Sequence, residues 1–404
     1  PYFIIDYDLS GFTDRVTSGI SNDTKVLVIN KSKYKLIKKY DEKLFNLIEA
    51  SLEISTLLNY NKLDIEFAID KKNIIHIFQV RPIVVDHAKY EFEYNKFNQV
   101  IKNAQNSFLR WQKPGINILG KSTIFSNMAD WNPAEMIGIH PNPLAISLYK
   151  YLITDEVWAK QRSEFGYKDV RPNPLLFTFC GQPFIDVRAS FNSFIPKSIP
   201  RDTGKRIVEG YLECLKEKPY LHDKIEFEIA YTIWTPDFYV SAKKRLNKKG
   251  VHDKDLKLLE IELKKITKNA LRSIHKIEIN FEKLLLNFKL VKNSDLDNLE
   301  IADNLIKDCK EFGTINFSHA ARLGFVAISF LNSFVRLNIL TESRKELFLQ
   351  NLGTILTDFE KDLTEKSIDD LVIKYGHLRP GTYEINRKAY WENPILYLKR
   401  SKNQ

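Results

Sequence analysis

One short stretch of the chain, "LDIEFAIDKKNIIHIFQVRPI" (residues 63–83), contains four polar side chains suited to chemistry. They are two acids, an amide and a guanidinium: Asp64, Glu66, Gln79 and Arg81. Mg²⁺ prefers oxygen ligands, which Glu66 and Gln79 can supply. A guanidinium presents a planar fork that matches phosphate oxygens. These residue types favour a magnesium–phosphate site, provided that the fold brings them together.

A β-hairpin would place these four side chains on one face. The first half of the stretch alternates with the period of a strand, and "DKKN" (Asp70–Asn73) predicts the turn. If the two lysines form a two-residue turn, Asp64 pairs with Gln79. Glu66 then pairs with Ile77, and paired residues share a face. The opposite face would carry the apolar side chains Ile65, Phe67, Ile69, Phe78 and Val80. A solvated edge hairpin has the same pattern, so periodicity alone leaves that alternative open.

The pattern "DIEFAID…IIHIFQVRPI" resembles the end of the ATP-grasp domain in the phosphoenolpyruvate synthase and pyruvate phosphate dikinase superfamily. There, an acid-x-acid strand precedes a Gln-x-Arg-Pro strand. The resemblance implies that Glu66 and Gln79 bind the Mg²⁺ of Mg·ATP and that Arg81 lies near the phosphates. Asp64 belongs to the same ATP-binding motif. The resemblance also implies a further N-terminal half of the ATP-grasp domain, and a swivelling phosphohistidine domain C-terminal to residue 404.

Composition limits the class of protein. The chain has 404 residues, 44% of them hydrophobic, enough for about two to three packed domains. The three cysteines are scattered without metal-ligand spacing, which favours a reducing compartment. The longest apolar run, residues 323–335, is too short to cross a bilayer. We therefore expect a cytoplasmic protein with no membrane partner.

A formal net charge of +10 raises the question of a nucleic-acid partner. The lysines are interspersed with acids, as in "KLLEIELKKITK" (257–268), which is typical of a solvated helix face. Since no basic stripe appears, we expect no nucleic-acid binding.

The predicted fold class is α+β. The resemblance implies a partial ATP-grasp α/β domain (1–90), followed by a helix and linker (91–125) and by a mainly helical acceptor-substrate domain (126–404). A small β-hairpin is expected at 175–189, with its turn at Gly181 and Gln182. A long amphipathic helical stretch is expected at 253–290. Its apolar stripe has helical spacing: Leu256, Leu259, Leu263, Ile266 and Ala270.

"GINILGKS" (115–122) matches the Walker A phosphate-binding pattern. That motif requires a strand before it and a helix after it, so that loop amides can cradle phosphates. Neither is predicted here, and the segment is interpreted as the linker into the second domain.

Four segments of the second domain carry candidate binding residues. In "MADWNPAEMIG" (128–138), Asn132 and Pro133 are expected to start a helix, which leaves Asp130 as a freer candidate ligand. In "DVRASFNSFIP" (186–196), Asp186 and Arg188 are expected on one face of a strand, either paired or binding a ligand.

The other two segments place their polar residues on a helix and in a loop. "FSHAARLGF" (317–325) places His319 and Arg322 on one helix face. "YGHLRPGTYEI" (375–385) contains His377, Arg379 and Glu384 in a loop with few apolar residues, which favours binding over packing. An interdomain hinge would use the same glycines and proline.

Together these segments resemble the central domain of the L-glutamine kinase family, a group of that superfamily found in capsular-polysaccharide loci. Rifampicin phosphotransferases have a similar histidine–arginine–glycine stretch. The resemblance implies that ATP is converted to AMP and phosphate, and that a phosphoryl group passes through a histidine to an acceptor. In this family the acceptor is the amide nitrogen of L-glutamine, and the product serves capsular phosphoramidate modification.

The resemblance leads to hypotheses for individual residues. His377 or Glu384 would act as the base, and Arg379 would hold the developing phosphate charge. Arg188 would bind the α-carboxylate of the acceptor and Asp130 its α-ammonium group. His319 and Arg322 are further candidate substrate contacts. Two alternatives remain: the same relay with pyruvate or a drug-like or sugar hydroxyl as acceptor, and a non-catalytic binding module descended from such an enzyme.

Overall fold

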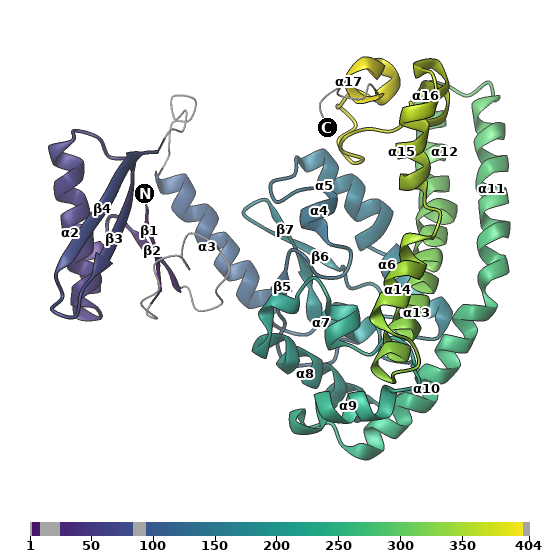
Figure 1. Ribbon diagram of the computed structural model, residues 1–404, viewed down its shortest axis with the longest axis horizontal. Helices are drawn as coiled ribbons and strands as arrows, with labels where there is room; N and C mark the ends of the chain where they lie inside the picture. Colours follow the sequence, from purple (N-terminus) through teal and green to yellow (C-terminus); the bar gives the residue numbers. More distant parts are fainter. Residues whose placement is uncertain (1, 9–24, 84–93, 399–404) are drawn as a thin grey trace. The chain divides into compact units, whose positions relative to one another are not determined.

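The computed structural model describes residues 2–8, 25–83 and 94–398 (Figure 1). The chain divides into two compact units, Pro1–Ile101 and Lys102–Gln404. The division falls within helix α3 (Tyr94–Trp111), in the segment 91–125 that was expected to contain a helix and a linker.

The first unit contains two antiparallel strand pairs and a helix. Strand β1 (Tyr2–Tyr7) pairs with β2 (Lys25–Asn30), and β3 (Leu63–Ile69) pairs with β4 (Ile75–Pro82). A 3₁₀ turn, η1 (Tyr34–Lys39), precedes helix α2 (Glu42–Leu57). The core of this unit consists of Ile5, Ile29, Leu44, Leu47 and Ile48, against which Phe67 and Ile75 pack. The β-hairpin expected within residues 63–83 is confirmed.

The β3–β4 hairpin has a different register from the predicted one. Asp64 lies opposite Arg81 and Glu66 opposite Gln79, with a bulge after Glu66. The loop is longer than two residues because the carboxylate of Asp70 accepts hydrogen bonds from the N–H groups of Lys72 (2.8 Å) and Ile74 (2.9 Å).

The bulge also changes which side chains lie on the apolar face. Phe78 was predicted to lie there but is 65% exposed. Ile77, opposite Phe67, and Ile75, opposite Ile69, take its place. The four polar residues nevertheless share one face, as predicted.

The second unit is mostly helical, with one small antiparallel sheet in the order β5–β7–β6. The strands are β5 (Phe125–Ser126), β6 (Leu176–Phe179) and β7 (Gln182–Asp186). The helices up to α10 are α4 (Pro133–Met136), α5 (Pro143–Tyr149), α6 (Val157–Phe165), α7 (Val187–Ser193), α8 (Arg201–Glu217), α9 (Phe238–Leu246) and α10 (Asp253–Arg272). The later helices are α11 (Ile274–Lys292), α12 (Asn298–Asp308), α13 (Ile315–Arg336), α14 (Glu342–Gln350), α15 (Ile355–Glu365), α16 (Ile368–Tyr375) and α17 (Pro394–Leu398). The α+β class with a mostly helical second part is therefore confirmed.

Short 3₁₀ and π-helical turns connect several of these helices. They are η2 (Lys150–Thr154), η3 (Pro219–Leu221), η4 (Ile225–Ile229), η5 (Asn247–Lys249), η6 (Cys309–Thr314) and η7 (Tyr390–Glu392). The turns η3 and η4 follow helix α8. Two residues of the sites described below lie here: His222 directly after η3, and Glu226 within η4.

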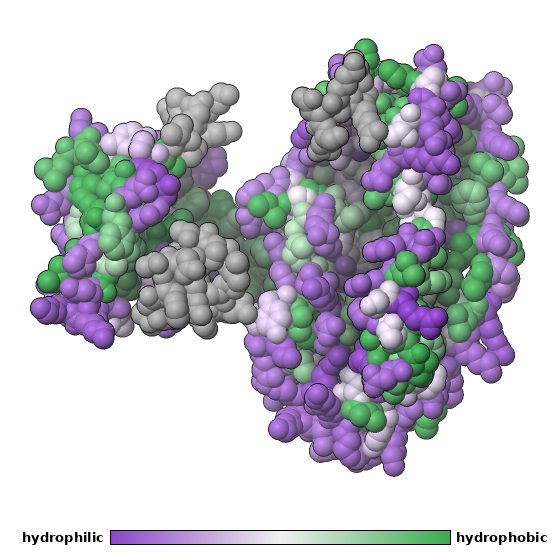
Figure 2. Space-filling view, viewed as in Figure 1, coloured by the Kyte–Doolittle hydropathy of each residue, from purple (hydrophilic) through white to green (hydrophobic). Residues whose placement is uncertain are grey.

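The predicted apolar stripe of the 253–290 stretch is confirmed on α10. Leu256, Leu259, Leu263, Ile266 and Ala270 are all buried in the main core of the second unit. The stretch forms two helices rather than one, because the helix is interrupted at Ser273. Figure 2 shows apolar patches among the polar side chains of this unit, and on α11 Phe281 and Leu290 are 59% and 62% exposed.

The helix start predicted at Asn132 and Pro133 is confirmed, but the strand expected through Ala189 is not. Asn132 and Asn142 cap helices α4 and α5, each followed by a proline. Strand β7 ends at Asp186, whose carboxylate accepts a hydrogen bond from the N–H of Ala189 at 2.9 Å. That contact starts helix α7, so Arg188 lies on a helix.

The segment 115–122 forms neither a P-loop nor a free linker. Strand β5, not a helix, follows it, and the main chain of the segment is hydrogen-bonded to the core of the second unit. Leu119 donates through its N–H to the side-chain oxygen of Asn192 (2.7 Å), and the Asn192 amide donates back to the Leu119 carbonyl (2.9 Å). Within the described ranges, no helix has the length and apolar character needed to cross a membrane.

Candidate functional site

The first candidate site is the polar face of the β3–β4 hairpin. The guanidinium of Arg81 lies 2.6 Å from the carboxylate of Glu66 and 3.3 Å from that of Asp64. These three side chains are 41–57% exposed, so the face is open to solvent. Gln79 lies directly opposite Glu66, on the same face. The hairpin therefore holds two acids, an amide and an arginine in contact range of one another.

This donor set can hold Mg²⁺ only together with other ligands. No group of three or more potential metal-ligating side chains (His, Cys, Asp or Glu) lies together in the described parts of the chain. Mg²⁺ is usually bound by one or two carboxylates, with water and substrate phosphates completing its octahedron. The hairpin fits that requirement through Glu66 and Gln79. Arg81, which now pairs with Glu66, would then turn to the phosphate oxygens.

The second candidate site is a buried network of two acids and two arginines in the second unit. Arg162 on α6 binds Asp130 through both terminal nitrogens, at 2.9 and 2.5 Å. Arg322 on α13 donates to Glu226 at 2.8 Å, and Arg162 lies 3.8 Å from Glu226. All four side chains are at most 9% exposed. Their formal charges cancel, which offsets part of the cost of removing charges from water.

Neighbouring polar and aromatic groups complete this network. Ser190 donates to Asp130 (2.6 Å), and Arg162 donates to Ser193 (2.7 Å). The Phe194 ring contacts both guanidiniums, with its centroid 4.0 Å from that of Arg162 and 5.0 Å from that of Arg322. Burial is the largest single effect and opposes the charge on Arg322, but Glu226, Tyr167 and Asp130 together outweigh it and raise the pKa of this guanidinium.

The network and its surroundings bring together all four segments that were singled out in the second domain. Ser190 connects segment 186–196 to Asp130. The Trp131 ring packs against that of Phe317 in segment 317–325, with the ring centroids 6.1 Å apart. Tyr149 donates to the Trp131 carbonyl at 2.6 Å. Its ring packs at 5.2 Å against Tyr383 of segment 375–385, where burial raises the pKa of Tyr383 to about 12.

His319 is placed at the edge of this region. It precedes Arg322 by one turn of α13, and its ring packs against Phe165 at 5.0 Å. Its Nε2 lies 3.1 Å from the carboxylate of Glu164, and this contact lowers the pKa of Glu164. His319 is 4% exposed, so a ligand would reach it only if the surrounding side chains moved.

Arg188 does not have the geometry expected of a substrate-binding arginine. Its side chain is 1% exposed and lies 3.7 Å from Asp186. It donates to the carbonyls of Gln112 (2.7 Å), Trp111 (3.1 Å) and Lys113 (3.1 Å), at the C-terminal end of α3. These are carbonyls that a helix end leaves without intrahelical partners. Arg188 therefore anchors this chain segment, and its contact with a substrate carboxylate stays a prediction.

In the loop after α16, two of the three candidate residues contact other residues of the same loop. Arg379 donates to the carbonyls of Ile385 (3.3 Å) and Arg387, and Glu384 pairs with the Arg387 side chain. His377 is exposed. The structure places these residues in one loop, without a direct contact to the buried network among the described residues. Tyr383 provides the connection instead.

Sequence analysis missed Arg162 and Glu226. Arg162 lies in a helix where Val157, Trp158 and Phe165 are also buried, so an arginine among such residues was the available signal. Glu226 lies in "IEFEI", whose alternation suggests a strand with outward acids. The segment is instead the π-helical turn η4, which directs Glu226 inward.

Comparisons with known proteins give no further assignment. No family model matches the chain, and neither a curated protein nor a solved structure matches it.

Proposed function

We propose that the chain provides the nucleotide-binding and acceptor-binding parts of an ATP-dependent phosphotransferase that works through a phosphohistidine. In this proposal, the reaction takes ATP, water and L-glutamine to AMP, phosphate and glutamine phosphorylated on its amide nitrogen. The protein would be cytoplasmic, and its product would serve capsular-polysaccharide modification. The transferring histidine would belong to a swivelling phosphohistidine domain.

The polar face of the β3–β4 hairpin is the observation that carries this proposal. Glu66 and Gln79 lie opposite each other, which suits shared contact with one Mg²⁺. Arg81 is held beside Glu66 at 2.6 Å. When Mg·ATP binds, Mg²⁺ would neutralise the charge of Glu66. The Arg81 guanidinium would then bind the phosphate oxygens instead of Glu66. Asp64, 3.3 Å from Arg81, would keep the guanidinium oriented.

The buried network supports an amino-acid acceptor. An α-amino acid presents a carboxylate and an ammonium group at one end, which require an arginine and an acid close together. The network supplies two such pairs, Arg162 with Asp130 and Arg322 with Glu226. Because these residues already satisfy one another, the acceptor would have to replace one internal pair. We assign the carboxylate to Arg322, in exchange for Glu226.

The loop 375–385 would supply the proton chemistry. The amide nitrogen is a poor nucleophile because its lone pair is delocalised into the carbonyl group. His377 would take the proton that this nitrogen loses as the N–P bond forms. Arg379 would face the phosphoryl oxygens after it leaves the carbonyls that it now contacts. Tyr383, packed against Tyr149, holds the loop beside the network.

Calorimetric titration with Mg·AMPPNP, a non-hydrolysable nucleotide, tests the nucleotide site. Glu66→Gln and Arg81→Gln should each weaken Mg²⁺-dependent binding by about 10-fold or more, the loss typical of a removed charge-assisted contact. Glu53→Gln, at an exposed position of α2 in the same unit, is the matched control and should bind like the unmodified protein. Equal affinities for Glu66→Gln and Glu53→Gln would refute the hairpin assignment.

A further inference from the structure

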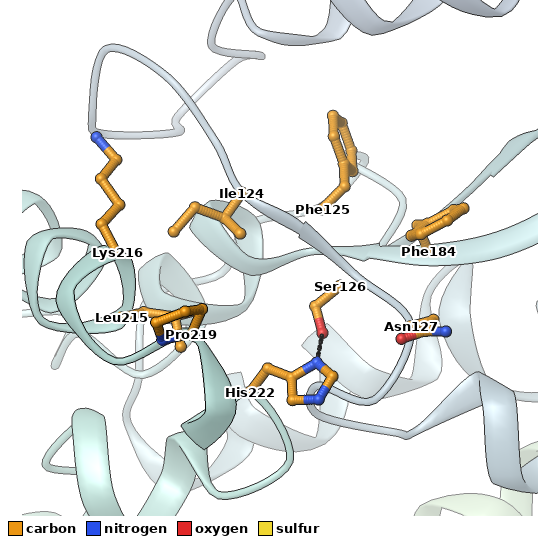
Figure 3. A pocket seen from close by; sticks show the side chains of 9 residues that line it. All are labelled: Ile124, Phe125, Ser126, Asn127, Phe184, Leu215, Lys216, Pro219 and His222. Atoms are coloured by element: carbon orange, nitrogen blue, oxygen red, sulfur yellow. Dashed lines mark hydrogen bonds between the residues drawn. The ribbon is translucent and has the colours of Figure 1, made fainter. Parts of the chain in front are cut away.

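A separate pocket opens in the second unit beside strand β5. Its volume is about 340 Å³, which lies in the range of small-ligand sites. Figure 3 shows Ile124, Leu215 and Pro219 gathered on one side of it, and the aromatic rings of Phe125 and Phe184 on the other. The walls are therefore aliphatic on one side and aromatic on the other.

A polar pair lies between these apolar walls. The Ser126 hydroxyl and the Nδ1 of His222 are 3.0 Å apart and hydrogen-bonded (Figure 3). The Ser126 oxygen also accepts a hydrogen bond from the N–H of Met128 at 3.3 Å. Ser126 is 5% exposed, and His222 is half-buried at the end of turn η3. This pair can both donate to and accept from one ligand oxygen.

The charge of the pocket excludes an amino-acid ligand. Lys216 is the charged residue of its lining, and Figure 3 shows the Lys216 ammonium directed away from the Ser126–His222 pair. The lining contains neither an acid nor an arginine. A zwitterion would have to lose its hydration here without gaining partners for its charges. The pocket is therefore chemically different from the buried acid–arginine network.

We propose that this pocket binds a small, uncharged aromatic molecule that carries one hydroxyl group. The ring would lie between the aliphatic side chains and the edges of Phe125 and Phe184, where apolar burial and aromatic contact favour it. The hydroxyl would hydrogen-bond to the Ser126–His222 pair. The site does not depend on the proposed nucleotide reaction and should bind its ligand without ATP.

The test uses p-cresol and toluene, which differ by one hydroxyl group. Ligand-observed NMR titration should show saturable p-cresol binding with a dissociation constant of about 1 mM or tighter, as expected for a ligand of this size. Toluene should bind the same site more weakly.

Two substitutions locate the binding and its polar contact. Ser126→Ala should weaken p-cresol binding by about 2- to 10-fold, the loss of affinity expected when one hydrogen bond is removed. It should leave toluene binding unchanged. Ile124→Phe should weaken binding of both ligands, because the larger side chain would fill part of the pocket. Ser163→Ala makes the same chemical change on α6, outside the pocket lining, and should alter neither. Non-saturable p-cresol binding, or binding unaffected by both Ser126→Ala and Ile124→Phe, would overturn the proposal.

Discussion

Replacing Arg188 tests the role that the structure gives it. Arg188 is 1% exposed and contacts Asp186 at 3.7 Å. Arg188→Met keeps a side chain of similar length but removes the charge and every donor. Three carbonyls at the end of α3 then lose their hydrogen bonds, each worth about 1–3 kcal/mol when buried. Asp186 loses its partner for a buried charge, for which losses are typically about 3–5 kcal/mol.

These contributions overlap, and the methionine recovers some apolar contact. We therefore expect Arg188→Met to lower the free energy of unfolding of the second unit by about 3–5 kcal/mol. Urea unfolding followed by tryptophan fluorescence measures this unit separately, since all five tryptophans of the chain lie in it. With a slope near 3 kcal/mol per molar urea, the midpoint should fall by about 1–2 M.

Two further variants make this experiment specific. Arg188→Lys keeps the charge but lacks the planar fork, so we expect a smaller loss of about 1–3 kcal/mol. Arg171→Met removes an exposed arginine that pairs with Asp169 at 2.6 Å, and should cost at most about 1 kcal/mol. An Arg188→Met protein as stable as Arg171→Met but unable to bind the acceptor would refute the structural role. It would restore the substrate role first expected for this residue.

Two further predictions concern buried acids of the second unit. Asp130→Asn should lower the free energy of unfolding by about 3–5 kcal/mol, because Arg162 loses its bidentate partner; the same urea assay measures this, and an unchanged midpoint would contradict it. The hydrogen bond from Arg206 lowers the pKa of Asp255 to about 2. A lowered pKa stabilises the folded state above the ordinary value of about 4, and this stabilisation is lost as the pH falls towards about 2. Asp255→Asn should therefore flatten the decline in stability between about pH 5 and pH 2, and an unchanged pH profile would argue against this pairing.

The sequence predicted the features that depend on neighbouring residues. Asn132 before Pro133 specifies a helix start because the cap and the proline act within one turn. The stripe from Leu256 to Ala270 is a local periodicity and is buried as predicted. The polar face of the hairpin followed from alternation, although its register required the bulge after Glu66 and the hydrogen bonds of Asp70.

Features that depend on distant residues were not predicted. The contact between Arg322 and Glu226 joins residues 96 positions apart, and that between Ser126 and His222 also spans 96 positions. No periodicity along the chain encodes such pairs. Arg188 was wrongly placed on a strand because the strand was continued past Asp186, where the cap of α7 ends it. The chemical types of these residues were informative, but their partners came from tertiary packing.

The most direct test of the central proposal is ³¹P NMR of the full-length protein incubated with Mg·ATP and L-glutamine. The proposal predicts resonances of AMP and phosphate, and a new phosphorus resonance that splits when the glutamine amide carries ¹⁵N. It also predicts that Glu66→Gln abolishes all three, whereas Glu53→Gln does not. ATP that stays intact with glutamine and with hydroxyl-bearing acceptors would contradict the phosphotransferase assignment.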